Sequence, residues 1–166
     1  MPNKTIYSVL EKDSKTTSAN LNKFYKILMD LRFGGKQDTS KSMAQLVRLV
    51  AYFKKEVVEH MREEEKILFP FLRKHIPRLE PMIWLLLSEH DDFRNALKDL
   101  SLSLSIFKKV GSDKARIIHQ LNEQGIYLLC LLRGHMSVET QSLYRAADQE
   151  LRPDEKKQLF DKIKKK

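Results

Sequence analysis

The sequence contains little cysteine, glycine or proline, and it has no long apolar run. Cys130 is the single cysteine, which excludes a disulfide within the chain and favours a reducing cytoplasm. It lies in the apolar run YLLCLLR, so we expect it to be a small core residue. No run approaches the roughly 20 apolar residues that cross a bilayer, and the start MPNKTIYSVL lacks the apolar core of a secretory signal. We therefore expect a cytoplasmic protein.

Signals for β-strands are also missing, because there are no alternating β-branched runs and no Asn-Gly hairpin turns. Glycine and proline occur five times each, at positions that suit the ends of helices. Asn3 or Thr5 can cap a first helix, and Ser112 or Asp113 a fourth. Pro153 suits the first position of a short C-terminal helix. These positions predict long helices over about 5–33, 40–75, 79–110 and 113–149.

Four long helices with short connections predict an all-α fold, an antiparallel up-down four-helix bundle with a short C-terminal helix. The 166 residues suit one domain, with 42% hydrophobic and 32% charged residues, and no linker divides them. We therefore expect residues 1–166 to form a single domain.

The formal net charge is +9, which raises the question of a nucleic-acid partner. Six lysines fall within residues 156–166, and the other basic residues are scattered among acids. No interleaving of aromatic and basic residues indicates a surface for stacking bases. The pattern favours a solvated basic C-terminal helix or tail over 153–166, which leaves a protein partner open and disfavours nucleic acid.

Polar residues interrupt the inward-facing apolar stripes of three long helices. His60 and Glu64 lie on the stripe of the second helix, His90 on that of the third, and His135 and Glu139 on that of the fourth. Residues four apart lie one helical turn from each other, so each His-x-x-x-Glu pair shares a face. A lone inward histidine is usually a hydrogen-bonded core residue, but two inward pairs with a third histidine between them indicate a shared site.

A metal ion is the simplest compensation for two inward carboxylates, since burying them without partners costs several kcal/mol each. Imidazole and carboxylate ligands without sulfur suit iron or manganese, and zinc is a possible substitute. Carboxylates can bridge two ions in the core of a bundle. His75, close to a helix end, and His119, on the far face of the fourth helix, are expected to be surface residues and not ligands.

The segments HMREEEKILFP, SEHDDFR and GHMSVETQSLY, followed by a helix that opens RPDEKKQ, resemble the hemerythrin-like HHE cation-binding family. The resemblance spans nearly the whole chain. It implies an antiparallel four-helix bundle with a non-haem di-iron centre. Carried over by position, it implies that His60, His90 and His135 are terminal iron ligands and that Glu64 and Glu139 bridge the irons.

The sequence departs from the family pattern at two places. Oxygen-carrying hemerythrins have a second histidine one turn after His90, where this chain has Arg94. The family also has a histidine on the first helix, where Ser14 stands here, and water or Glu11 can fill that place. The remaining ligand pattern is more similar to the branch that repairs iron–sulfur centres or senses iron and nitric oxide.

Two functions therefore remain open from the sequence. The first is a cytoplasmic non-haem iron protein, di-iron or with a mononuclear or partly filled site, that binds oxygen or nitric oxide or that handles or senses iron. The second is a metal-poor bundle that acts as an interaction or regulatory module. Nothing in the sequence marks a substrate pocket, which disfavours an oxidase.

Overall fold

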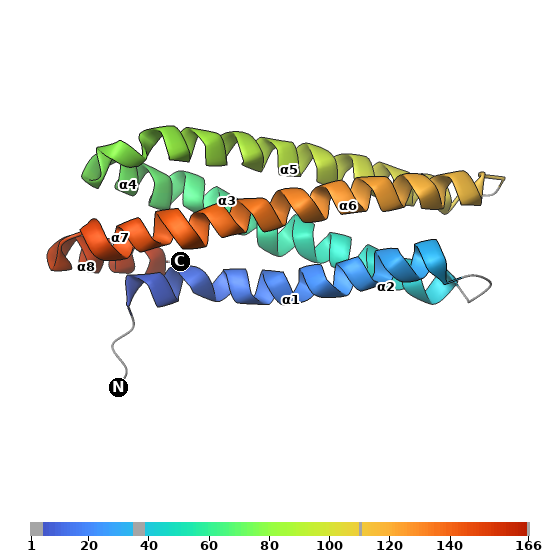
Figure 1. Ribbon diagram of the computed structural model, residues 1–166, viewed down its shortest axis with the longest axis horizontal. Helices are drawn as coiled ribbons and strands as arrows, with labels where there is room; N and C mark the ends of the chain where they lie inside the picture. The colour runs from blue at the N-terminus through green and yellow to red at the C-terminus, as the bar shows by residue number, and fades with distance from the viewer. Residues whose placement is uncertain (1–4, 35–38, 110, 166) are drawn as a thin grey trace.

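The computed structural model describes residues 5–34, 39–109 and 111–165, and every regular element in these ranges is helical. The long segments run along the length of the molecule (Figure 1). In chain order the helices are α1 (Ile6–Phe33), α2 (Thr39–Tyr52), α3 (Val58–Glu63), α4 (Phe69–His75), α5 (Glu80–Phe107), α6 (Lys114–Val138), α7 (Tyr144–Glu150) and α8 (Pro153–Lys164). The prediction of an all-helical protein is confirmed.

Three π-helical turns and one 3-10 turn join some of these helices into longer segments. The π turns are Phe53–Val57, Glu64–Leu68 and Glu139–Leu143, and the 3-10 turn is Pro77–Leu79. The long predicted helices therefore correspond to α1, to α2 through α4, to α5, and to α6 with α7.

The helix starts follow the predicted capping chemistry. The Thr5 side chain accepts a hydrogen bond from the backbone N–H of Ser8, and the Asp113 side chain accepts one from that of Arg116. The other proposed cap of the first helix, Asn3, lies outside the described residues. Pro153 begins α8, where its missing N–H costs no helical hydrogen bond.

The buried apolar residues form two clusters along the bundle. One cluster includes Phe24, Phe53 and Phe93, and the other includes Phe69 and Tyr144. α6 packs against both α5 and α1, and α1 packs against α2 and α7. α8 covers the second cluster with Leu159, which is fully buried. The inward polar residues therefore lie between the two apolar clusters.

Two expectations about single residues are wrong. Cys130 is exposed, because it lies on the outer side of α6 although apolar residues flank it in the sequence. His75 is half-buried, and its Nδ1 lies 3.0 Å from Glu155 Oε1, so this pair ties α8 to α4. His119 is exposed as expected and pairs with Glu123. Within the described ranges, no helix is both long enough and apolar enough to cross a membrane.

Candidate metal centre

Two π turns position the acidic residues of the candidate site. Glu64 begins the π turn between α3 and α4, and Glu139 begins the one between α6 and α7. Four residues of an α-helix turn slightly further than one full circle, so residues spaced by four drift around the helix. A π turn holds more residues than an α turn and therefore offsets this drift. Each inward stripe therefore continues past its glutamate to Leu68 or Leu143, and both carboxylates stay buried, with exposures of 3% and 2%.

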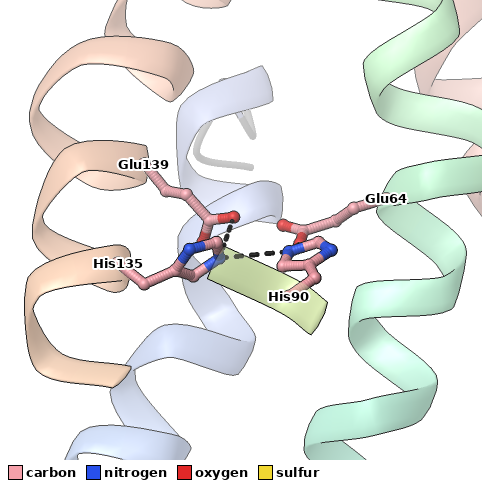
Figure 2. Close-up of side chains that lie close together, drawn as sticks. All are labelled: Glu64, His90, His135 and Glu139. Atoms are coloured by element: carbon pink, nitrogen blue, oxygen red, sulfur yellow. Dashed lines mark hydrogen bonds and ion pairs between the residues drawn. The ribbon is translucent and has the colours of Figure 1, made fainter. Parts of the chain in front are cut away.

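Three helical passes bring Glu64, His90, His135 and Glu139 together in the core (Figure 2). Each residue offers one ligand atom, and these four atoms lie within 4.8 Å of one another. His90 and His135 are buried, with exposures of 0% and 4%. The fifth predicted residue, His60, borders this group, because its Nε2 lies 3.0 Å from Glu64 Oε1. Its side chain is 26% exposed, so His60 forms the outer side of the cluster.

Each histidine of the cluster presents Nδ1 to a carboxylate. The contacts are His60 with Asp13 at 3.0 Å, His90 with Glu65 at 2.8 Å and His135 with Glu89 at 2.7 Å. Because a carboxylate accepts the hydrogen bond, these contacts assign a proton to each Nδ1. Carboxylates commonly hold metal-binding histidines in this way, and they fix both the tautomer and the orientation of the ring.

The Nε2 atoms point the other way, toward one another and toward the buried glutamates. His90 Nε2 lies 3.1 Å from His135 Nε2, and His135 Nε2 lies 2.9 Å from Glu139 Oε1. With Nδ1 protonated, a neutral imidazole presents a lone pair at Nε2. Lone pairs of nitrogen and oxygen therefore face each other at hydrogen-bond distance. This arrangement requires a cation between them, either protons or a metal ion.

In the metal-free protein, protons supply this positive charge. Burial lowers the pKa of His60, but the charge of Glu64 and the hydrogen bonds to Asp13 and Glu64 outweigh it and raise the pKa to about 11. Burial likewise lowers the pKa of His135, and contacts with Glu139 raise it to about 9. Both histidines are therefore protonated at neutral pH when no metal is present.

The pKa values of the two glutamates shift in opposite directions. Burial raises the pKa of Glu64, but His60 and His90 outweigh it and hold the pKa well below its usual range. Burial and the nearby charge of Glu64 raise the pKa of Glu139 above its ordinary value. The two carboxylates therefore repel each other, which is the situation that a shared cation relieves.

Tyr144 contributes a hydroxyl that lies between the carboxylates, 2.9 Å from Glu64 Oε1 and 3.3 Å from Glu139 Oε2. Burial, together with the charges of Glu64 and Glu139, raises the pKa of this hydroxyl well above its ordinary value. Tyr144 therefore stays protonated, and its O–H donates a hydrogen bond to one carboxylate at a time. Glu64 Oε2 and Glu139 Oε1 are buried and face histidine nitrogens, His90 Nε2 at 3.3 Å and His135 Nε2 at 2.9 Å.

These observations fit a metal ion. Metal–ligand bonds of about 2.1 Å place ligand atoms on opposite sides of one ion about 4.2 Å apart. Movements of a few tenths of an ångström would therefore bring the four buried residues around an ion, since their ligand atoms already lie within 4.8 Å. The donors are imidazole nitrogen and carboxylate oxygen, which suit iron. A metal ion would replace the protons that lie between these histidine nitrogens and carboxylate oxygens.

Ser14, Glu11 and Arg94, the other positions singled out in the sequence, differ in how they relate to the cluster. Ser14 is buried and lines a small cavity together with His60, Glu64 and Glu139. Glu11 pairs with Lys15 on the same helix and is not among the residues that line this cavity.

Arg94 reaches the cluster only indirectly. It donates to Glu65 at 2.6 Å, and Glu65 in turn contacts His90. Burial raises the pKa of Glu65, but Arg94 and His90 outweigh it and lower the pKa. Glu65 therefore stays ionised beside His90.

Sequence reasoning missed the residues that orient the histidines. Glu65 follows the inward residue Glu64 in the chain, and it contacts His90. Asp13 and Glu89 each lie next to an inward residue in the chain, one position off the stripe, so helical periodicity gives no reason to expect them at the site. Their adjacency to Ser14 and His90 was the available signal, since a long side chain beside the stripe can reach a ring on the neighbouring helix. Tyr144 gave no separate signal in the sequence.

A family model described as "Hemerythrin HHE cation binding domain" matches residues 5–147. Searches of curated proteins and of solved structures gave no significant match. The matched segment begins at the cap of α1 and ends within α7, so it contains the five clustered residues and the carboxylates that orient the histidines. Because the match covers most of the chain, this protein belongs to the hemerythrin HHE cation-binding domain family.

Proposed function

We propose that this chain is a non-haem iron protein whose centre is held by His60, Glu64, His90, His135 and Glu139. One observation carries the proposal: three histidines have Nδ1 occupied by carboxylates and Nε2 directed at two buried glutamates. Membership of a cation-binding family supports it. We also propose that residues 1–166 form one domain with the antiparallel up-down bundle of that family.

The proposed centre is a di-iron centre with two unequal halves. Glu64 and Glu139 face each other between the histidines, as bridging carboxylates do in the cores of helical bundles. His90 and His135 would complete one half with the two glutamates, since these four residues already lie together. His60 alone would serve the other half, because Ser14 occupies the place of the first-helix histidine. This second half is the weaker one and accounts for partial filling.

A small diatomic ligand such as oxygen or nitric oxide fits the space beside His60. The cavity lined by Ser14, Thr17, His60 and the two glutamates has a volume of about 20 Å³. A volume of that size holds roughly one water molecule, so it excludes an organic substrate. We therefore favour binding or sensing of a diatomic ligand, or sensing of iron itself, over turnover of a larger substrate. The exposed thiol of Cys130 suits a reducing cytoplasm.

When bound, iron supplies a Lewis-acidic and redox-active position for such a ligand. The chain's own residues prepare this position. Asp13, Glu65 and Glu89 hold the three imidazoles with Nε2 directed inward. Tyr144 keeps its proton and stabilises the facing carboxylates. The apolar side chains of Val57, Met61, Leu132 and Met136 line the same cavity and limit access of water to it.

Iron content tests this function directly. We expect anaerobic reconstitution with ferrous iron to leave between one and two irons on each wild-type chain, and His90→Ala and Glu139→Ala to lose most of it. His119→Ala is the matched control, because His119 is an exposed histidine on the same helix as His135 and pairs with Glu123. Wild-type protein that retains no iron after reconstitution would refute the proposal.

The same measurement separates the alternative, a metal-poor bundle that acts as an interaction or regulatory module. Ser14 favours this alternative, because it stands where the family has a histidine. The basic C-terminal segment 153–166 would then provide the surface for a protein partner. In that case wild type and His90→Ala would contain equally little iron.

A further inference from the structure

A second, larger hollow lies directly outside the candidate centre. It is a surface cleft of about 460 Å³ between α1 and the segment from Tyr52 to Glu63. Four carboxylates line it, from Asp13, Glu56, Glu59 and Glu63, and His60 lies among them. No lysine or arginine is among its lining residues. This is a local reversal of sign, since the chain has 31 lysine and arginine residues against 22 acids.

The cleft and the buried cavity adjoin. Asp13, Thr17 and His60 line both of them, so these three residues form the boundary between the surface and the centre. His60 is 26% exposed, whereas the other four residues of the centre are at most 4% exposed. On the inner side of this boundary lie Glu64 and Glu139, whose buried carboxylates line the cavity and face the histidines of the proposed centre. The acidic cleft therefore adjoins the cavity that holds the buried carboxylates of the proposed centre.

Two basic residues form ion pairs with carboxylates of the cleft. Lys55 lies 3.7 Å from Glu56, and Arg62 lies 3.2 Å from Glu59. All four of these side chains are more than half exposed, so water and salt weaken the pairs. Lys55 and Arg62 are not among the lining residues, and the lining presents four carboxylates against one histidine, His60.

We propose that this cleft is the entrance through which divalent metal ions reach the centre. The proposal rests on the proposed iron-binding function and adds the route by which the ion arrives. Clustered charges of one sign in a cleft concentrate counter-ions and accelerate their association. Ser14 is part of this route, because its small side chain leaves open the cavity between His60 and the buried glutamates.

Metal uptake rates test the entrance. The test variant is Glu56→Gln/Glu59→Gln/Glu63→Gln, which removes three charges from the cleft and leaves all five proposed ligands and Asp13 intact. The control is Asp30→Asn/Asp99→Asn/Glu123→Gln, which removes three charges from exposed residues that do not line the cleft. Co²⁺ is the probe, because its visible absorption reports binding to nitrogen and oxygen ligands in a stopped-flow instrument.

We expect the cleft variant to take up Co²⁺ about tenfold more slowly than the control at low ionic strength. The difference should shrink at 0.5 M salt, where charges are screened beyond about 4 Å. Final Co²⁺ stoichiometry should match that of wild type. Equal Co²⁺ uptake rates for the two variants, with normal stoichiometry, would refute the proposal that the cleft is the entrance. The proposed iron-binding function would not be affected by that result. Absence of Co²⁺ and iron binding to wild type would overturn both.

Discussion

Glu89 offers the sharpest test of how the centre is held, because it acts on the proposed ligand His135 without being a ligand itself. Glu89 Oε2 accepts a hydrogen bond from His135 Nδ1 at 2.7 Å, a length typical of a charge-assisted bond. This contact directs Nε2 toward Glu139 and raises the basicity of the ring. Replacing Glu89 with alanine should therefore weaken metal binding and leave the ligand set unchanged.

The expected magnitude follows from the burial of the pair. Loss of such an orienting carboxylate typically costs 10- to 100-fold in metal affinity, or about 1.4–2.8 kcal/mol. The Glu89 side chain is 23% exposed, so water can replace part of the lost hydrogen bond. We therefore expect Glu89→Ala to weaken binding about tenfold, at the lower end of that range. Glu89→Gln keeps an acceptor oxygen without its charge and should lose about half as much free energy.

Anaerobic competition for ferrous iron against a chromophoric chelator measures this affinity. The matched control is Glu123→Ala, which removes the partner of His119, an exposed histidine on the same helix. Circular dichroism at each step verifies that the variants remain folded. If Glu89→Ala binds iron within twofold of Glu123→Ala, the contact with His135 does not orient a ligand, and the reasoning is wrong.

Two further predictions concern pH and Ser14. The folded pKa values of His60 and His135, about 11 and about 9, lie above the ordinary value of 6.5, so their stabilisation of the metal-free protein is complete below pH 6.5 and declines as pH rises through 9 and 11. The melting temperature of the metal-free protein should therefore fall from pH 6.5 to pH 9. The increase in melting temperature that Co²⁺ causes should grow over the same range, because the metal competes with fewer protons. A Co²⁺-induced increase that is constant across this range would contradict the assignment of protonated His60 and His135. Ser14→His should place an imidazole beside His60 and move iron loading toward two per chain, and identical ferrous titrations for this variant and wild type would show that the first helix only packs.

Much of the fold follows from local features of the sequence. Thr5, Asp113 and Pro153 act at helix ends through their own backbone geometry and short-range hydrogen bonds, so they can be read without knowledge of distant residues. The inward stripes follow from helical periodicity. They also led to Glu64, His90, His135 and Glu139, because polar residues within an apolar stripe are evident in a linear pattern.

The tertiary structure alone decided how those residues meet. Glu65 and Glu89 lie beside the stripe, and only the packing of neighbouring helices brings them to His90 and His135. The π turns that begin at Glu64 and Glu139 also escaped prediction, since a π turn depends on how inward residues pack and carries no periodic signature of its own. The sequence by itself determined which residue types face inward on each helix. Their partners, protonation and access to solvent depend on distances between helices, which are set when the apolar clusters on either side pack together.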